Sequence, residues 1–155
     1  MRPYDRRLQL LLTATARIFA ERGFHATSMR ELSRASGMSL AGIYHYVRSK
    51  AELLFLIQER CLAQVVAAAR EAVGAETDPE ARIQAFIRHH VVFFAGHMDE
   101  MKVLSREEDE LTGTQRAQVR RRKREYVNLL LGLLDAVGGP RVGRHTAAYA
   151  LFGMM

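Results

Sequence analysis

The feature that most constrains this chain is a pair of short helical segments, separated by a glycine, within residues 27–47. Ser28 and Glu31 have the spacing of a capping box, which predicts a helix over residues 29–36. Gly37 follows directly, and glycine takes the left-handed conformation that ends a helix without strain. A second short helix begins about three residues later, and this arrangement is typical of a helix-turn-helix.

The second helix, predicted from Leu40 to about Val47 with Ser39 as its cap, has an unusual surface. Ile43 and Val47 are four residues apart and are expected to face inward. None of the other residues is Lys, Arg, Asp or Glu, although a surface helix normally carries charges. Small residues allow close approach to a DNA groove, and Tyr and His can donate to phosphates or base edges, as a recognition helix requires. A short linker helix in an all-α enzyme is the alternative.

The positive charge of the chain lies on the segment with these two helices. Residues 1–50 hold nine basic and three acidic side chains, whereas residues 51–155 hold equal numbers of each. The whole net charge of +6 therefore belongs to residues 1–50. This asymmetry is expected of a module that binds nucleic-acid phosphates.

These residues resemble the N-terminal domain of the tetracycline-repressor (TetR) family over about residues 8–54. The resemblance rests on motifs in one register: Phe19, Glu21, Gly23-Phe24, Thr27-Ser28, Gly37-Met38-Ser39, Ile43-Tyr44-His45-Tyr46, Ser49-Lys50 and Glu52-Leu53. Val47 and Ala51 depart from the usual Phe and Glu of the family. The predicted DNA-binding residues are Thr27, Ser28, Ser39, Leu40, Ala41, Gly42, Tyr44, His45, Tyr46, Ser49 and Lys50.

The rest of the chain predicts an all-α fold, with few prolines and no alternating β-branched runs. We expect a helix-turn-helix domain over residues 1–48 and a helical ligand-binding and dimerisation domain over residues 49–155. A second capping box, Ser49 with Glu52, should open a long helix, and Asp78-Pro79 should open another. The single Cys61 fits a reducing cytoplasm, and no apolar run reaches membrane-spanning length.

Aromatic, Met and His side chains collect in the C-terminal half. They predict either an ordinary bundle core or the lining of an effector pocket, which is mostly apolar with a few polar groups. The predicted ligand-binding residues are Phe86, His90, Phe93, Phe94, His97, Met101, Tyr126 and Leu130. A loose similarity of residues 94–126 to acyl-CoA-responsive members of the family implies an acyl-CoA-like effector.

Two clusters leave alternatives open. A metal site from His90, His97 and residues 107–110 matches no metal-binding spacing, so we predict no metal ligands. The basic run at residues 120–124 is expected to pair with the acidic residues 107–110, to make a second phosphate contact, or to bind an anionic ligand such as a CoA phosphate.

The sequence as a whole predicts a ligand-responsive transcriptional regulator. We expect a repressor that acts as a homodimer on a near-palindromic double-stranded DNA operator, in the cytoplasm, without a membrane partner. An architectural DNA-binding protein without an effector and an all-α enzyme are the alternatives, although no catalytic constellation stands out and we predict no catalytic residue. Family members normally continue past the last predicted helix, which begins near Gly143. We therefore expect a truncated chain after Met155, with weak dimerisation.

Overall fold

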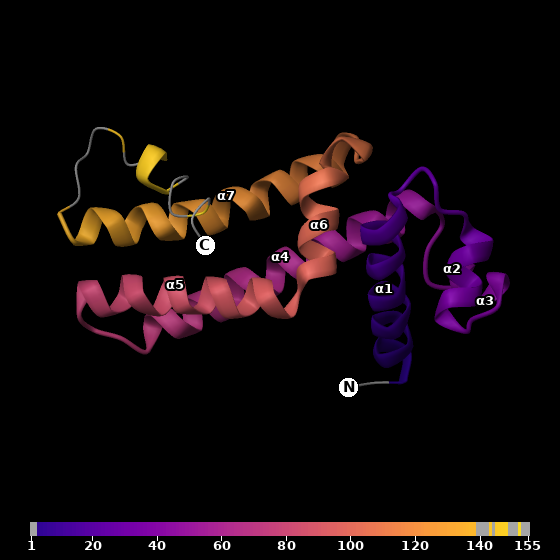
Figure 1. The fold of residues 1–155 in the computed structure, drawn as a ribbon, viewed down its shortest axis with the longest axis horizontal. Helices are drawn as coiled ribbons and strands as arrows, with labels where there is room; N and C mark the ends of the chain where they lie inside the picture. Colours follow the sequence, from indigo (N-terminus) through magenta and orange to yellow (C-terminus); the bar gives the residue numbers. More distant parts are fainter. Residues whose placement is uncertain (1–2, 139–142, 144, 149–151, 153–155) are drawn as a thin grey trace. The chain divides into compact units, whose positions relative to one another are not determined.

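The computed structural model describes residues 3–138, 143, 145–148 and 152, and it confirms the all-α prediction. Its helices are α1 (Pro3–Arg22), α2 (Met29–Ser36), α3 (Leu40–Tyr44), α4 (Lys50–Gly74), α5 (Pro79–Gly96), α6 (Met98–Arg106) and α7 (Gly113–Ala136), with the short 3-10 helix η1 (Glu108–Glu110) before α7 (Figure 1). The described residues include no β-strand. No helix among them is both long enough and apolar enough to cross a membrane.

The chain divides into two compact units. The first contains residues up to Cys61 together with His97–Val119, and the second contains Leu62–Gly96 with the chain from Arg120 onward. Two helices, α4 and α7, therefore begin in the first unit and end in the second.

In the first unit, α1 packs against α2 and α6. The inner face of α1 buries Leu11, Leu12 and Phe19 at helical spacing, as the sequence predicts. Leu32 of α2 and Ile43 of α3 are also buried, at 1% and 0% exposure. These contacts hold the two short helices, since an isolated helix of eight or five residues is unstable in water.

Several helix ends differ from the sequence prediction. Asp5 lies within the first turn of α1 because Pro3 takes the first helical position, where its missing N–H costs nothing. The sequence predicts a loop at residues 112–114, but α7 already begins at Gly113. The sequence also predicts a helix from about Asp99 to Leu111, whereas the structure has α6, which ends at Arg106, followed by η1. Residues 145–148 are helical, whereas Leu151 and Met154, predicted for the same helix, lie outside the described residues.

In the second unit, α5 contacts both the C-terminal part of α4 and α7. Nε2 of His89 lies 3.2 Å from the carbonyl oxygen of Val65 in α4. Nδ1 of His90 lies 3.0 Å from the hydroxyl of Tyr126 in α7. The predicted cap of α5 is confirmed, because the Ala81 N–H donates to Asp78 Oδ2 over 2.8 Å.

Candidate nucleic-acid interface

The first helix of the motif, α2, is fixed at both ends by its own sequence. Ser28 Oγ accepts from the Glu31 N–H over 3.3 Å, and the Ser28 N–H donates to Glu31 Oε2 over 2.7 Å. Both halves of the predicted capping box are therefore present. The hydrogen bonds from Ser28 and the charge of Arg22, 3.1 Å away, lower the pKa of Glu31. Gly37 ends the helix at φ 65°, in the left-handed region expected for it.

The second helix, α3, turns its few apolar anchors inward. Ser39 caps it by accepting from the Gly42 N–H over 3.0 Å. Ile43 and Val47 are buried, at 0% and 2% exposure. Val47 lies beyond the last helical residue, Tyr44, but its N–H still donates to the Ile43 carbonyl over 3.1 Å. The hydrogen bonding thus carries Val47 to the inner face, although α3 is shorter than predicted.

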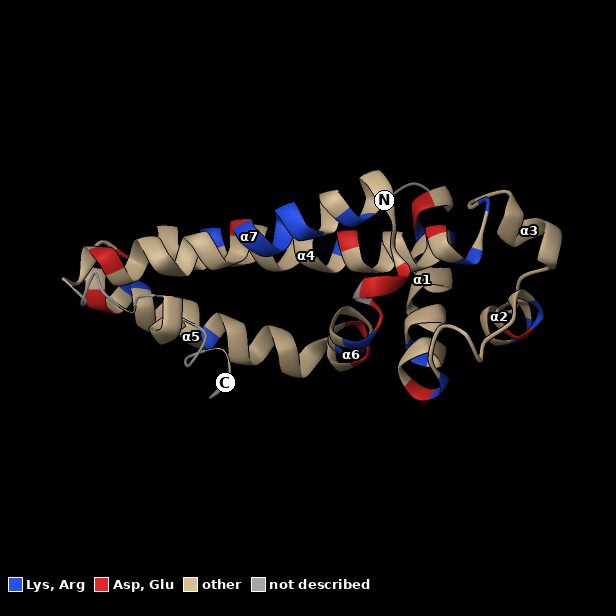
Figure 2. Cartoon of the chain, turned by 90° about the horizontal axis from the view of Figure 1, so that it is seen from above, with Lys and Arg blue, Asp and Glu red and all other residues tan. Residues whose placement is uncertain are grey.

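The outer face of α3 has no charged side chain, as Figure 2 shows. This face and the turn that follows contain most of the residues predicted to bind DNA. Five of them are exposed and two are half-buried: Ser39, Leu40, Ala41, Tyr44 and His45 are exposed, and Gly42 and Tyr46 are half-buried. The helix thus presents small and hydrogen-bonding groups, which suits the major groove of DNA.

Thr27 and Lys50, also predicted to bind DNA, make hydrogen bonds within the unit: Thr27 is buried and Lys50 is half-buried. Thr27 is 1% exposed, and its hydroxyl donates to the Gly23 carbonyl over 2.8 Å. Nζ of Lys50 donates to the carbonyls of Phe24 and Thr27 over 2.7 and 2.8 Å and lies 4.4 Å from the centre of the Phe24 ring. An ammonium has three N–H groups, so one donor of Lys50 remains beyond these two bonds.

The start of α4 differs from the predicted capping box in one half. Ser49 is exposed, and its hydroxyl accepts from the Glu52 N–H over 3.1 Å, as expected. The Glu52 carboxylate reaches back to the N–H of Arg48, over 2.6 Å, rather than to the N–H of Ser49. This N-terminus is exposed, so its positive dipole end can attract an anion such as a phosphate.

Sequence reasoning missed how α6 and η1 contact the loop after α1. Glu107 Oε1 accepts from the Phe24 N–H over 3.1 Å, and Glu110 lies 2.8 Å from Nε2 of His25. Gln58 of α4 is fully buried, and its amide lies 3.4 Å from the Glu107 carbonyl. Two of the four acidic residues expected to pair with the basic run at 120–124 thus contact the loop after α1. No local pattern signals pairs so distant in sequence.

The basic run itself makes local ion pairs on α7. Arg121 and Arg122 lie 3.8 and 3.2 Å from the carboxylate of Glu125. Both guanidinium groups are at least partly exposed. Such pairs add little stability, because water screens them.

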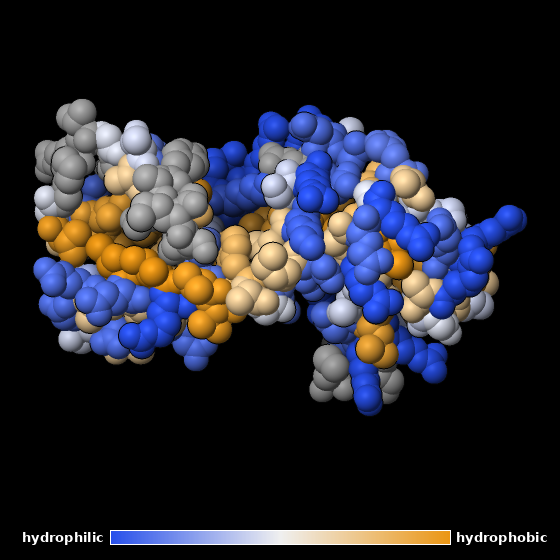
Figure 3. Space-filling model, in the orientation of Figure 1, coloured by the Kyte–Doolittle hydropathy of each residue, from blue (hydrophilic) through white to orange (hydrophobic). Residues whose placement is uncertain are grey.

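Four of the predicted ligand-binding residues meet in an aromatic cluster of the second unit. The Phe94 ring lies nearly parallel to the His90 ring, with centroids 3.8 Å apart. The rings of Phe86, Tyr126 and Phe152 surround the His90 ring. Burial, with the neighbouring His89 as a smaller cause, lowers the pKa of His90 from 6.5 to about 4. Burial also raises the pKa of Tyr126. The cluster is therefore apolar and neutral, with one buried pair of hydrogen-bonding groups. Hydrophobic residues also gather on the visible surface of the second unit along α5 (Figure 3).

The other predicted ligand-binding residues are distributed over both units. Leu130 is buried in the second unit, where Phe93 is half-buried and its ring lies 5.6 Å from that of His89. His97 and Met101 are half-buried and belong to the first unit, in and before α6. The described residues contain no cluster of three or more His, Cys, Asp or Glu side chains that could hold a metal ion.

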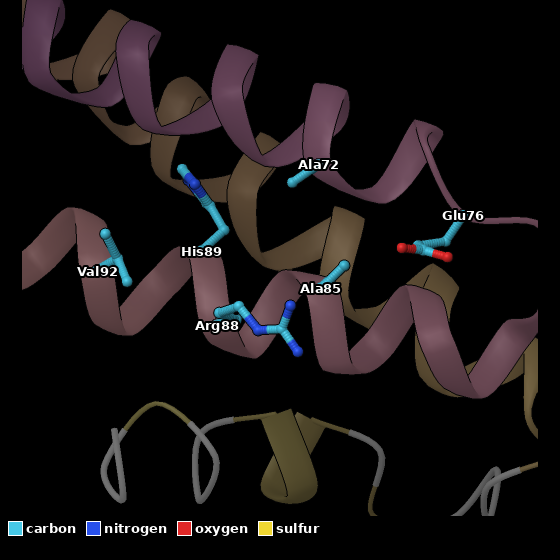
Figure 4. Close-up of a pocket in the computed structure, with 6 residues that line it drawn as sticks. All are labelled: Ala72, Glu76, Ala85, Arg88, His89 and Val92. Carbon is cyan, nitrogen blue, oxygen red and sulfur yellow. The ribbon is translucent and has the colours of Figure 1, made fainter.

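An open groove of about 370 Å³ lies between α4 and α5 in the second unit. Figure 4 shows Ala72 and Glu76 on one side, and Ala85, Arg88, His89 and Val92 on α5. Burial lowers the pKa of His89 here, which favours its neutral form. The groove thus combines one cation, one anion and small apolar side chains.

A helix-turn-helix with an uncharged outer face, joined to a helical bundle, defines the class of DNA-binding transcriptional regulators. Residues 11–57 match the family model described as bacterial regulatory proteins, tetR family, and residues 76–155 match the tetracyclin repressor-like C-terminal domain. The second match covers over half of the chain. The protein belongs to the TetR family of transcriptional regulators, as the motifs in residues 8–54 predict.

Two curated relatives match the chain in part. The transcriptional activator FasR of Mycolicibacterium smegmatis is 33% identical over 85 residues, which are 55% of this chain and 39% of FasR. The repressor KstR2 of Mycobacterium tuberculosis is 29% identical over 102 residues, which are 61% of this chain and 51% of KstR2. The chain thus matches about half or less of the length of these relatives.

Among solved structures, the chain is similar to AibR, which was crystallised in complex with isovaleryl coenzyme A and operator DNA. The identity is 30% and the TM-score 0.83, and the match covers 96% of this chain and 83% of AibR. This likeness extends over both compact units.

Proposed function

We propose that this regulator is a repressor that binds a near-palindromic operator as a homodimer and leaves it when a small-molecule effector binds. The exposed, uncharged outer face of α3 carries the proposal, together with the positive excess on residues 1–50. The proposal divides the chain into a DNA-binding domain, residues 1–48, and an effector and dimerisation domain, residues 49–155. The proposal includes a cytoplasmic location, because its target is DNA.

We assign base contacts to Tyr44, His45 and Tyr46, at the C-terminal end of α3. Their rings and hydrogen-bonding groups can reach base edges that the small residues of α3 allow to come close. Phosphate contacts fall to the exposed helix starts at Ser28 and Ser49 and to the remaining N–H of Lys50. Thr27 supports the surface from inside, because its side chain is buried.

The experiment that tests DNA binding begins with duplexes selected from a random-sequence pool by the unaltered protein. Replacement of His45 by Ala should change the base preference. Lys50→Met should weaken binding to all sequences and reduce the slope of log affinity against log salt by roughly 0.9, if its remaining N–H binds a phosphate. Lys102→Met, an exposed lysine on α6, is the matched control and should leave the slope unchanged. Failure to select any duplex refutes the proposed function.

The homodimer and the palindrome are tested by the same selected duplexes. Two recognition helices must reach successive major grooves, roughly 34–36 Å apart. We therefore expect an inverted repeat in the selected sequences and two chains per duplex by light scattering. Single half-sites, each with one chain, would refute the dimer.

We propose an acyl-CoA as the effector. The likeness to AibR supports this choice, as does the similarity of residues 94–126 to acyl-CoA-responsive family members. The candidate site lies around His90, Phe93 and Phe94 on α5 and Tyr126 on α7, where apolar rings surround a small number of polar groups. Isovaleryl coenzyme A is the first probe for a thermal-shift assay, because a ligand of the folded state raises its apparent stability.

The switch can use the contacts that fix the helix-turn-helix. Helix α4 begins at Lys50, which holds the loop after α1, and continues without a break into the second unit. An effector with a hundredfold preference for the released state supplies roughly 2.7 kcal/mol, enough to shift a moderately biased equilibrium.

Phe93→Trp or Ala85→Phe should alter induction in a reporter assay while basal operator binding persists. An acyl-CoA that binds tightly without changing operator affinity would refute this switch. Reporter expression that falls when the protein is deleted would identify an activator instead.

A further inference from the structure

Three aromatic side chains meet at one edge of the recognition surface: Tyr4 from the start of α1, and His45 and Tyr46 from the turn after α3. Tyr4 lies in the first turn of α1, and its ring centroid is 4.7 Å from that of Tyr46, at an interplanar angle of 36°. The Tyr4 ring also lies 6.3 Å from the His45 ring, at 75°. His45 and Tyr46 contact each other edge to face, with centroids 5.4 Å apart at 87°.

Hydrogen bonds to the carbonyls of Ala41 and Ile43 fix the backbone at His45 and Tyr46, whereas no side-chain hydrogen bond of these two residues is seen among the described residues. Helix α3 has only five residues and ends at Tyr44, one residue before His45. Its buried anchors are Ile43 and Val47, which fix the backbone but not the outer side chains. Tyr44, which is 48% exposed, makes no ring contact with any described residue. The Tyr4 ring thus restricts the two neighbouring rings at a site where the fold otherwise leaves side chains free.

We propose that Tyr4 is a positioning residue for DNA recognition, which holds Tyr46 and His45 in the orientation that reads base edges. The proposal rests on the proposed DNA-binding function and adds a residue from α1 to the surface formed by α3. Tyr4 acts through its ring, because offset and edge-to-face ring pairs have preferred geometries that limit rotation. Removal of the ring leaves Tyr46 and His45 to be ordered when DNA binds, at a cost in affinity.

The experiment compares variants of the full chain on duplexes that the unaltered protein selects from a random pool. Tyr4→Phe keeps the ring and should keep both affinity and base preference. Tyr4→Ala and Tyr4→Leu should each lower affinity by roughly three- to tenfold, as expected when free side chains must be ordered on binding. They should also reduce discrimination at the base pairs that His45→Ala or Tyr46→Ala affects. The salt dependence should not change, because no charge is lost.

Thr13→Ala is the matched control, since Thr13 lies on α1, is exposed and is outside the ring cluster. It should bind like the unaltered protein. In a Tyr46→Ala, His45→Ala background, Tyr4→Ala should have no further effect, because the rings on which it acts are gone.

Three results would overturn the inference. The first is unaltered affinity and base preference in Tyr4→Ala and Tyr4→Leu. The second is a loss in Tyr4→Phe equal to that in Tyr4→Ala, which would assign the effect to the hydroxyl. The third is a full additional loss from Tyr4→Ala in the Tyr46→Ala, His45→Ala background. If the unaltered protein selects no duplex, the proposed function itself fails, so the two failures are distinguishable.

Discussion

The buried His90 should make the stability of the protein depend on pH in a way that its replacement removes. Burial lowers the pKa of His90 from 6.5 to about 4, and the side chain is 2% exposed. Between these two values the unfolded chain binds a proton at His90 and the folded chain does not. The stability that the neutral His90 contributes is therefore fully present above pH 6.5 and is lost as the pH falls towards about 4.

The size of the pKa shift of His90 determines how much folding stability is lost at low pH. It corresponds to a loss of about 3 kcal/mol when the pH has fallen below both pKa values. Between about pH 7 and about pH 5 the loss is about 2 kcal/mol, because most of the titration of the unfolded chain is then complete. For a domain with a total stability of about 5–15 kcal/mol this is a measurable change.

Urea denaturation at the two pH values, followed by circular dichroism, measures the effect. His90→Phe keeps a ring but removes the titrating group, so its stability should fall by about 2 kcal/mol less than that of the unaltered protein. Phe86→Leu is the matched control: it changes packing in the same cluster and should lower stability equally at both pH values. An equal fall in the unaltered protein and in His90→Phe would refute a lowered pKa at His90.

Three further predictions concern the helix-turn-helix, each measured by urea denaturation near neutral pH. Lys50→Met removes the hydrogen bonds to the carbonyls of Phe24 and Thr27 and should cost roughly 2–3 kcal/mol; a loss below about 0.5 kcal/mol would show that water replaces the ammonium. Gly37→Ala should cost about 1 kcal/mol through its positive φ alone, because an added Cβ meets no atom within 4 Å. Ser28→Ala should cost about 1 kcal/mol, and full stability would contradict the cap.

The features predicted from the sequence are local ones. The box at Ser28, the left-handed Gly37 and the cap at Asp78 each depend on residues within a few positions, and the structure confirms all three. The family and the all-α fold could be predicted because several such local signals occur at fixed spacings along the same stretch of sequence.

The features that could not be predicted depend on distant parts of the chain. The sequence predicts that Lys50 binds a phosphate, but it does not predict that the ammonium also donates to two loop carbonyls. The sequence groups Glu107 with three other acidic residues that could pair with the basic run at residues 120–124, but its carboxylate accepts from the Phe24 N–H. Tyr4 has no signal at all, because its contact with Tyr46 arises only when the first turn of α1 meets the turn after α3. Tertiary packing determines these partners, and the hydrophobic periodicity of the sequence does not predict them.

The division of the first unit into two stretches of sequence has a consequence for folding during synthesis. Phe24 and its acceptor Glu107 are 83 residues apart, and α6, which packs against α1, belongs to the later stretch. At roughly 5–20 residues per second, the ribosome makes the acceptor about 4 to 17 seconds after the donor. A nascent chain that ends between Cys61 and His97 thus contains every residue of the helix-turn-helix but lacks one side of its packing. During this interval we expect the side of α1 that α6 later covers to be open to a chaperone or to a second nascent chain.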